Sequence, residues 1–185
     1  MNVLGNSTKV LSTFLFFLAT FFSSNIASAY ELEENSTDKV YAQLSSSKNQ
    51  VGVGENIVKI ENIDAISGLK VKSHHEIEIE ESGLYFIMAT GQAGSEAFEL
   101  LGKVDMWLII NGIVQPHSNV SQTVTSSVSV YSFVLQNVLF LKKGDIVSVG
   151  MSASCPQLGL IANKNLAHEV DSPSFILSIF KVASK

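Results

Sequence analysis

The residues best suited to binding a metal ion lie in one short segment. His74 and His75 precede Glu76, Glu78 and Glu80, and calcium is the ion that carboxylate oxygens would select. In a strand, however, alternate residues on one face stand about 6–7 Å apart, too far to share one ion without help from another strand. The pattern therefore favours a solvated strand face whose charges discourage pairing at a sheet edge. We expect no cofactor, with calcium as the one alternative.

Other reactive side chains are scattered along the chain. Ser152, His168 and Asp171 supply the residue types of a hydrolase triad, but no nucleophile-elbow sequence surrounds any serine. Cys155 could be a reactive thiol or a bridge between subunits, although a buried small apolar side chain is the simpler interpretation. Trp107 could stack on a sugar, but a single tryptophan between apolar neighbours more often packs. The sequence therefore does not predict an enzyme.

Short strands must position these residues. The segment 83–90 follows a run of carboxylates and is apolar on both sides. In a strand its side chains alternate, Leu84, Phe86 and Met88 to one side and Tyr85, Ile87 and Ala89 to the other. Antiparallel sheets usually leave one face in water, so the second apolar face needs another cover. A partner subunit is one candidate.

The remaining pattern predicts an all-β fold. Asn111-Gly112 is the strongest hairpin signal, Lys142-Lys143-Gly144-Asp145 reads as a turn, and the stretch between residues 95 and 102 is either a loop or a short helical turn. Few segments carry a helical period, and about ten short strands separated by turn signals indicate a β-sandwich.

The first 29 residues predict a secretory signal peptide. Lys9 is their only charge, residues 10–22 are uncharged and mostly apolar, and Ala27-Ser28-Ala29 matches the small-x-small cleavage pattern. The apolar run is shorter than the roughly 20 residues that span a bilayer. We expect cleavage after Ala29, no stable membrane span afterwards, and a secreted protein, located in the periplasm or at the cell surface if the source is bacterial.

Cleavage would leave 185 − 29 = 156 residues, which suits a short polar leader (30–39) followed by one domain (40–182). That mature chain has 11 basic residues, all lysine, against 17 acids, for a net charge of −6. An acidic chain without arginine is a poor nucleic-acid binder. A lone cysteine forms no internal disulfide, so stability must come from the core or from oligomerisation.

In the chain after the predicted cleavage site, two sequences match the acceptor for N-linked glycans. They begin at Asn35 and Asn119. Such acceptors have meaning only in a eukaryotic secretory pathway, so the sequence leaves glycosylation open.

Four motifs follow one another in a familiar order. They are Gly83-Leu84-Tyr85-Phe86, Leu108-Ile109-Ile110-Asn111-Gly112, Leu141-Lys142-Lys143-Gly144-Asp145-Ile146-Val147 and the closing Ser174-Phe175-Ile176-Leu177-Ser178-Ile179-Phe180. Over residues 40–182 the sequence resembles the complement C1q-like globular domain of the C1q and tumour necrosis factor superfamily. It departs from that pattern by lacking a collagen stem, by carrying Ile87 where an aromatic residue is usual, and by an apparent insertion from Gly94 to Gly102.

The resemblance implies a two-sheet antiparallel jelly roll that assembles as a homotrimer and binds protein or glycan ligands outside the cell without catalysis. It also implies that the strand after Gly83 and the closing strand are neighbours, each with one face in the core and one face against a partner. Because the pattern does not tell the two faces apart, the interface candidates come from both: Tyr85, Ile87, Ile176 and Phe180.

Two other functions fit the same features. A structural component of a cell-surface or coat layer would use the trimer without a specific ligand. A secreted enzyme on a β-sandwich would need a pocket with perturbed acids, and the sequence shows no cluster of catalytic residue types.

Overall fold

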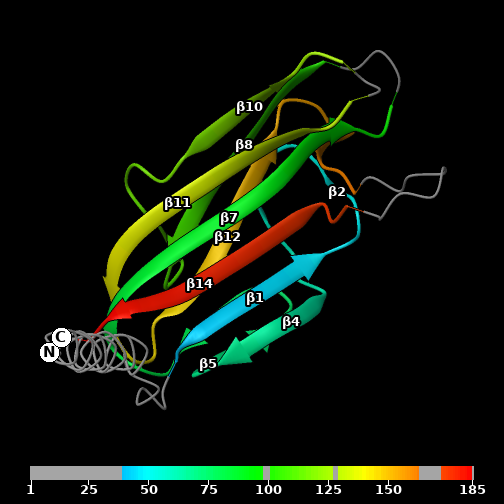
Figure 1. Cartoon of the computed structure of the whole chain (residues 1–185). Coiled ribbons are helices and arrows are strands. Elements are labelled where there is room, and N and C mark those ends of the chain that lie inside the picture. Colours follow the sequence, from blue (N-terminus) through cyan, green and yellow to red (C-terminus); the bar gives the residue numbers. More distant parts are fainter. Residues whose placement is uncertain (1–38, 98–100, 127–128, 163–171, 185) are drawn as a thin grey trace, which may run out of the picture. The chain divides into compact units, whose positions relative to one another are not determined.

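The computed structural model describes residues 39–97, 101–126, 129–162 and 172–184, all within one compact unit, Asp38–Lys185. These residues form fourteen strands and no helix (Figure 1). None of them belongs to a helix of the length and apolar character that crossing a membrane requires. The predicted signal segment, its cleavage site after Ala29 and the leader up to residue 38 lie outside the described residues.

The first sheet, here called sheet A, has β7 at its centre. β14 and β11 flank β7, β1 and β4 continue beyond β14, and β13 and β2 extend the sheet near the far end of β7. The bounds are β1 (Tyr41–Ser46), β2 (Gln50–Val51), β4 (Asn62–Ser67), β7 (Gly83–Ser95), β11 (Tyr131–Leu141), β13 (Leu158–Leu160) and β14 (Phe175–Ala183).

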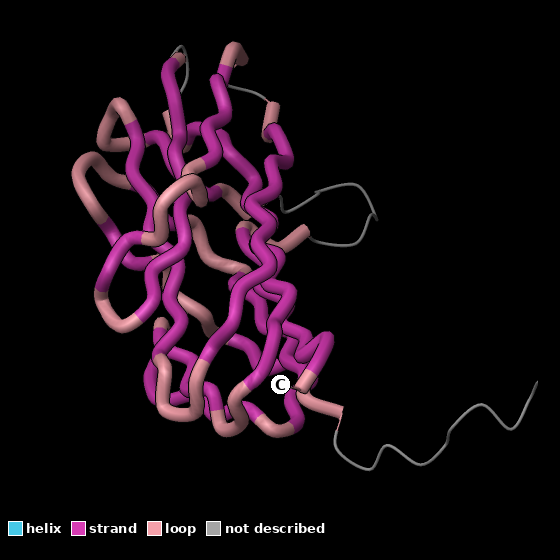
Figure 2. The backbone as a smooth tube through the Cα atoms, turned by 90° about the vertical axis from the view of Figure 1, so that its left-hand side faces the viewer, coloured by secondary structure: helices cyan, strands magenta, loops and turns pink. Residues whose placement is uncertain are grey.

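The second sheet, sheet B, runs in the order β10-β8-β12-β6-β5, with β3 paired to β12 and β9 paired to β8. Its bounds are β3 (Asn56–Ile57), β5 (Leu69–Ser73), β6 (Glu76–Ile79), β8 (Gly102–Ile110), β9 (Ile113–Val114), β10 (Val120–Val124) and β12 (Ile146–Ala153). All strand pairs in both sheets are antiparallel. Figure 2 shows the strands from the side, with turns at the lower end of the view and further loops along its left-hand side. The predicted two-sheet antiparallel fold is confirmed.

The core lies between the sheets and follows the alternation of each strand. Tyr85 and Ile87 of sheet A and Ile77 and Ile79 of sheet B are all fully buried. β7 continues through Ser95, so the stretch that sequence left ambiguous begins as strand rather than helix. Burying these large side chains, at about 1.5–3 kcal/mol each, is the main driving force for the sandwich.

The two turn motifs contact each other at one end of the sandwich. Asn111 and Gly112 have φ of 53° and 77°, the pair of positive values that a type I′ hairpin needs, and Gly144 has φ of 90°. The Asn111 side-chain amide donates to Asp145 Oδ1 at 2.9 Å, and the Ile146 N–H donates to Asn111 Oδ1 at 2.8 Å. The hairpin and the Lys-Gly-Asp turn are thus parts of one hydrogen-bonded corner.

Candidate interaction surfaces

The structure separates the four predicted interface residues by face. Tyr85 and Ile87 are fully buried in the core, whereas Phe180 is 43% exposed and Ile176 is partly exposed on the outer face of sheet A. Tyr85 and Ile87 therefore cannot touch a partner while the domain is folded. The outward residues of β7 are their sequence neighbours Leu84 and Phe86, so these two replace them as candidates for the interface.

Tyr85 has a structural role at the edge of the core. Its hydroxyl donates to the Glu81 carbonyl oxygen at 2.7 Å. Burial, assisted by the nearby Glu81 carboxylate, raises the pKa of the Tyr85 phenol to about 12. The phenol therefore stays neutral at any physiological pH and fixes the start of β7.

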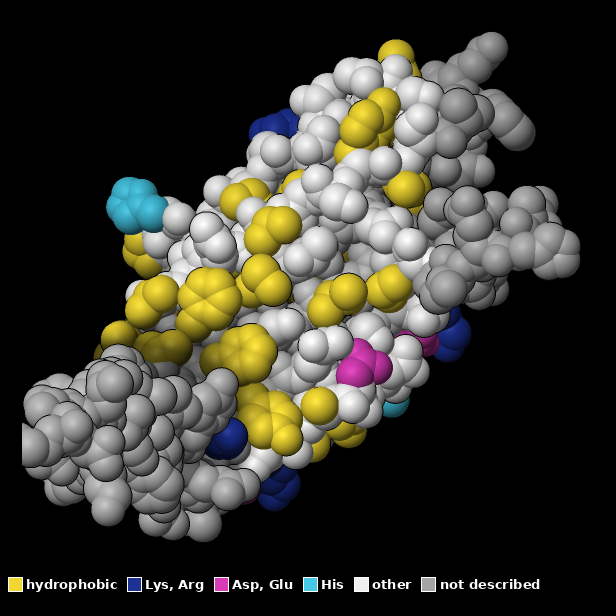
Figure 3. Space-filling model, viewed as in Figure 1, with side chains coloured by type: hydrophobic (Ala, Val, Ile, Leu, Met, Phe, Trp, Pro, Cys, Tyr) yellow, Lys and Arg dark blue, Asp and Glu magenta, His cyan; other side chains and the backbone are white. Residues whose placement is uncertain are grey.

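A row of apolar side chains crosses the outer face of sheet A. Strand register places Val138 opposite Phe86, Phe86 opposite Phe180, and Phe180 opposite Tyr41, so the row spans β11, β7, β14 and β1. Beside it, Leu84 faces Phe140 across β7 and β11. Figure 3 shows hydrophobic side chains spread over this face. Cross-strand neighbours stand about 5 Å apart, so the row is a continuous strip.

This face carries no charge on its three central described strands. Its outward residues are Ser132, Val134, Gln136, Val138 and Phe140 on β11, Leu84, Phe86, Met88, Thr90 and Gln92 on β7, and Ile176, Ser178 and Phe180 on β14. Val138 is 60% exposed and Phe140 is 42% exposed. Large apolar side chains in water without interspersed charges are typical of an interaction surface.

The outer face of sheet B has a different composition. Lys72 pairs with Glu78 at 3.3 Å and Lys103 pairs with Asp105 at 3.0 Å. Trp107 lies on this face but is only 8% exposed, because its indole covers Gly150, where a side chain would collide with the ring. Trp107 is therefore a packing residue, and its ring offers no open surface on which a sugar could stack.

The predicted chemical sites do not assemble. Among the described residues, no three His, Cys, Asp or Glu side chains lie close enough to hold a metal ion, so the calcium alternative finds no support. His74 lies in the turn after β5, and the Ser73 hydroxyl donates to Glu76 at 3.3 Å. His168, Asp171 and Asn35 lie outside the described residues. Of the other candidates, Cys155 packs partly buried against the core, Ser152 is half-buried and Asn119 is exposed.

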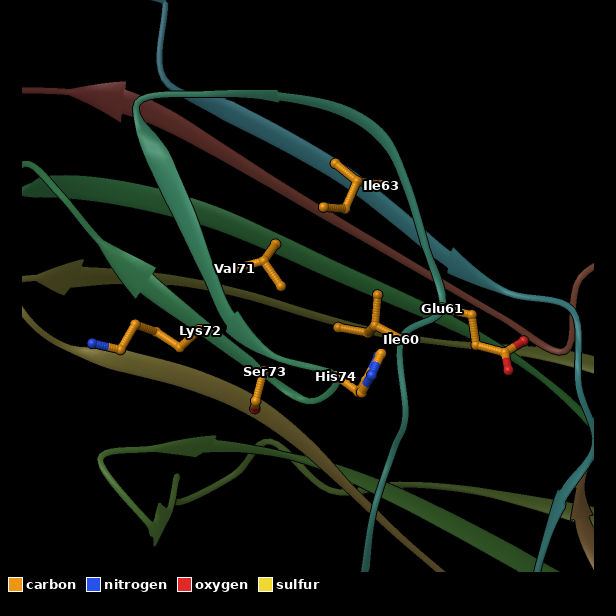
Figure 4. Close-up of a pocket in the computed structure, with 7 residues that line it drawn as sticks. All are labelled: Ile60, Glu61, Ile63, Val71, Lys72, Ser73 and His74. Atoms are coloured by element: carbon orange, nitrogen blue, oxygen red, sulfur yellow. The ribbon is translucent and has the colours of Figure 1, made fainter.

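A small groove lies between the free edges of the two sheets. β4 ends sheet A and β5 ends sheet B, and no other described strand pairs with the outer edge of either. The groove has a volume of about 260 Å³ and is lined by Ile60, Glu61, Ile63, Val71, Lys72, Ser73 and His74. In Figure 4, Ile60, Ile63 and Val71 point toward one space, whereas Lys72 points away from it. Sequence reasoning missed this groove, because its lining comes from separate segments of ordinary residue types.

The comparisons with known proteins support the fold. No protein-family model matches the sequence, and no curated protein matches it. Among solved structures, the chain is similar to the globular domain of the zebrafish complement 1qA protein, with a TM-score of 0.51 and 12% identity, over 80% of this chain and 100% of that one. At this identity the likeness concerns the fold alone. The described residues thus share the β-sandwich fold of this C1q globular domain.

Proposed function

We propose that this protein is a secreted, non-enzymatic binding module that acts as a homotrimer and recognises a protein or glycan ligand outside the cell. The observation that carries the proposal is the uncharged apolar strip on the outer face of sheet A, formed by Tyr41, Phe86, Val138 and Phe180. The similarity to a C1q globular domain supports the fold on which the proposal rests. The resemblance of the four sequence motifs to the C1q and tumour necrosis factor superfamily implies that such a domain assembles as a trimer.

The apolar strip is costly for a monomer in water. Each large apolar side chain left exposed forgoes about 1.5–3 kcal/mol relative to full burial. Soluble monomers rarely expose a broad contiguous apolar patch. A closed threefold arrangement would bury the strip on every copy and leave no free surface from which the assembly could grow.

Trimer formation would also strengthen binding by a module whose single-site contacts are weak. Three copies present three equivalent sets of loops, and a ligand that engages more than one copy gains avidity without any new contact. Weak single-site contacts then become functional only in the assembled state.

Binding arrays test this function directly. Protein recovered from expression of the full chain is applied to glycan and protein arrays beside a Phe180→Lys variant, which places a charge in the strip. The proposal predicts a restricted set of signals for the wild type that weaken strongly in the variant, because avidity is lost. Equal signals for both proteins would contradict it.

A further inference from the structure

We propose that the groove between β4 and β5 holds one branched aliphatic side chain of a protein partner. The inference rests on the proposed function and narrows its ligand from protein or glycan to protein. Ile63, at 56% exposed, forms one wall, Val71 forms the other, and Ile60, at 5% exposed, forms the floor.

The size of the groove limits what it can hold. Sites for cofactors and drug-sized ligands usually have volumes of roughly 300–1,000 Å³, and this groove has about 260 Å³. It is therefore smaller than the usual site for a cofactor, which favours a single side chain as the occupant.

The chemistry of the groove favours an apolar, uncharged occupant. Two charged groups of the lining already have partners. The Glu61 carboxylate forms an ion pair with the Lys48 ammonium group at 2.5 Å, and Lys72 forms one with Glu78. An occupant carrying a charge would compete with these pairs, whereas an aliphatic side chain would leave them intact and would cover the exposed Ile63. A sugar would bury hydroxyl groups against Ile60, Ile63 and Val71, which cannot hydrogen-bond them, and this is unfavourable. The polar groups of the lining belong to Glu61, Lys72, Ser73 and His74.

The groove is held open by the backbone that forms its floor. The Val58 N–H donates to Val149 of sheet B at 2.8 Å, the Ile60 N–H donates to the His74 carbonyl at 2.5 Å, and the Glu61 N–H donates to Ser45 of sheet A at 3.0 Å. This crossing segment is thus fixed to both sheets. A preformed site loses little conformational freedom on binding.

The occupant inserts a side chain and does not add a strand. The register of β4 against β1 shifts at Gln43/Leu44, and the register of β5 against β6 shifts at Val71/Ser73. Bulges of this kind, together with the exposed Lys70 and Lys72 on β5, discourage strand addition at an edge. A single anchor per copy binds weakly, so the partner should present several such anchors to the trimer.

A methyl NMR titration tests the proposal. Protein from expression of the full chain, labelled at isoleucine and valine methyl groups, is titrated with N-acetyl-isoleucine methylamide. Methyl glucoside and N-acetyl-glutamate methylamide are titrated in parallel as the glycan-like and charged probes. The proposal predicts saturable shifts of the Ile60, Ile63 and Val71 methyl signals with the isoleucine probe alone.

Variants at two equally exposed positions provide the control. Ile63→Lys should weaken binding of the isoleucine probe on the order of tenfold, because one apolar wall is lost. Val53→Lys changes a side chain that is 54% exposed and does not line the groove, so binding should stay unchanged. If Ile63→Lys fails to fold, Ile63→Thr removes apolar surface while keeping the branched shape.

The outcomes separate this proposal from the trimer. Equal shifts with all three probes, no saturable shift, or wild-type affinity in the Ile63 variants would overturn the groove assignment. Light scattering on the same samples reports assembly independently. A mass of one chain with saturable shifts would overturn the trimer and leave the groove assignment standing.

Discussion

The two outer faces of the sandwich are built from the same kind of strand but meet their surroundings differently. Sheet B places Lys72 beside Glu78 and Lys103 beside Asp105, and it covers Gly150 with its own Trp107. Sheet A has no charge on the outward positions of β11, β7 and β14, and it leaves Val138 and Phe180 in water.

This difference shows that alternation alone does not decide which face of a strand is wet. Both sheets send one set of side chains into a common core. The outer face of sheet B carries ion pairs and the large side chain of Trp107, whereas the outer face of sheet A is apolar on its central strands. Soluble monomers rarely expose a face of the second kind, which is why we propose that assembly occurs through sheet A.

The largest expected effect comes from placing charge on the apolar face. Phe86→Lys and Phe180→Lys put a lysine at directly opposed positions of β7 and β14. Burying either charge in an interface is unfavourable, so each variant should be a folded monomer, with its mass by light scattering reduced about threefold relative to the trimer that symmetry closure implies.

The matched change on the other face is Thr123→Lys, at an exposed outward position of β10. It should leave the mass unchanged. If all three variants kept the wild-type mass, the two faces would not differ in the way described.

The second prediction concerns the cover of sheet B. Gly150→Val would push a side chain into the Trp107 indole. Overpacking of this kind lowers the free energy of unfolding by about 1–3 kcal/mol, which urea denaturation would detect. Ser152→Val, two residues along the same strand and half-buried, is the control. An unchanged midpoint for Gly150→Val would show that Trp107 is free to move away.

The third prediction concerns the core that both faces share. Tyr85→Phe removes the hydrogen bond to the Glu81 carbonyl, which should cost about 0.5–1.5 kcal/mol at neutral pH. Because the folded pKa is about 12 and the ordinary value is 10, the phenol's contribution is complete below pH 10 and is lost as the pH rises from 10 to 12. Alkaline unfolding curves should therefore be flatter across that range in Tyr85→Phe. Curves parallel to the wild type would contradict the assignment.

The smallest effect is expected at the charges of sheet B. In the Lys72–Glu78 pair the two side chains are 44% and 26% exposed. Pairs this exposed contribute at most about 1 kcal/mol, so Lys72→Ala should shift the thermal midpoint slightly, and less at high salt. A large loss of stability would mean that this ion pair contributes substantially to the folding free energy and does not merely keep the outer face of sheet B hydrated.

The sequence predicted much of the fold because its strongest signals are local. Asn111-Gly112 and Gly144 need positive φ, and they mark their turns directly. The double apolar character of 83–90 correctly indicated a strand with two apolar faces. It could not tell the core face from the outer face, because Tyr85 and Phe86 are equally good core residues; only the pairing of the two sheets separates them.

Two features depended on tertiary structure and escaped prediction. β4 (Asn62–Ser67) contains Asn62 and Asp64, which disfavour strands, and it forms because β1 offers it an edge. The groove beside it depends on Ile60, Ile63 and Val71, which converge only after the chain crosses from one sheet to the other. No local pattern encodes that convergence.

The most direct test of the central claim is the mass in solution of the wild-type protein. Light scattering at micromolar concentration on material purified after expression of the full chain should give three times the mass of one chain, because closed threefold packing buries the outer face of sheet A. A mass of one chain at that concentration would contradict the claim, since the strip of Tyr41, Phe86, Val138 and Phe180 would then be stable in water without a partner.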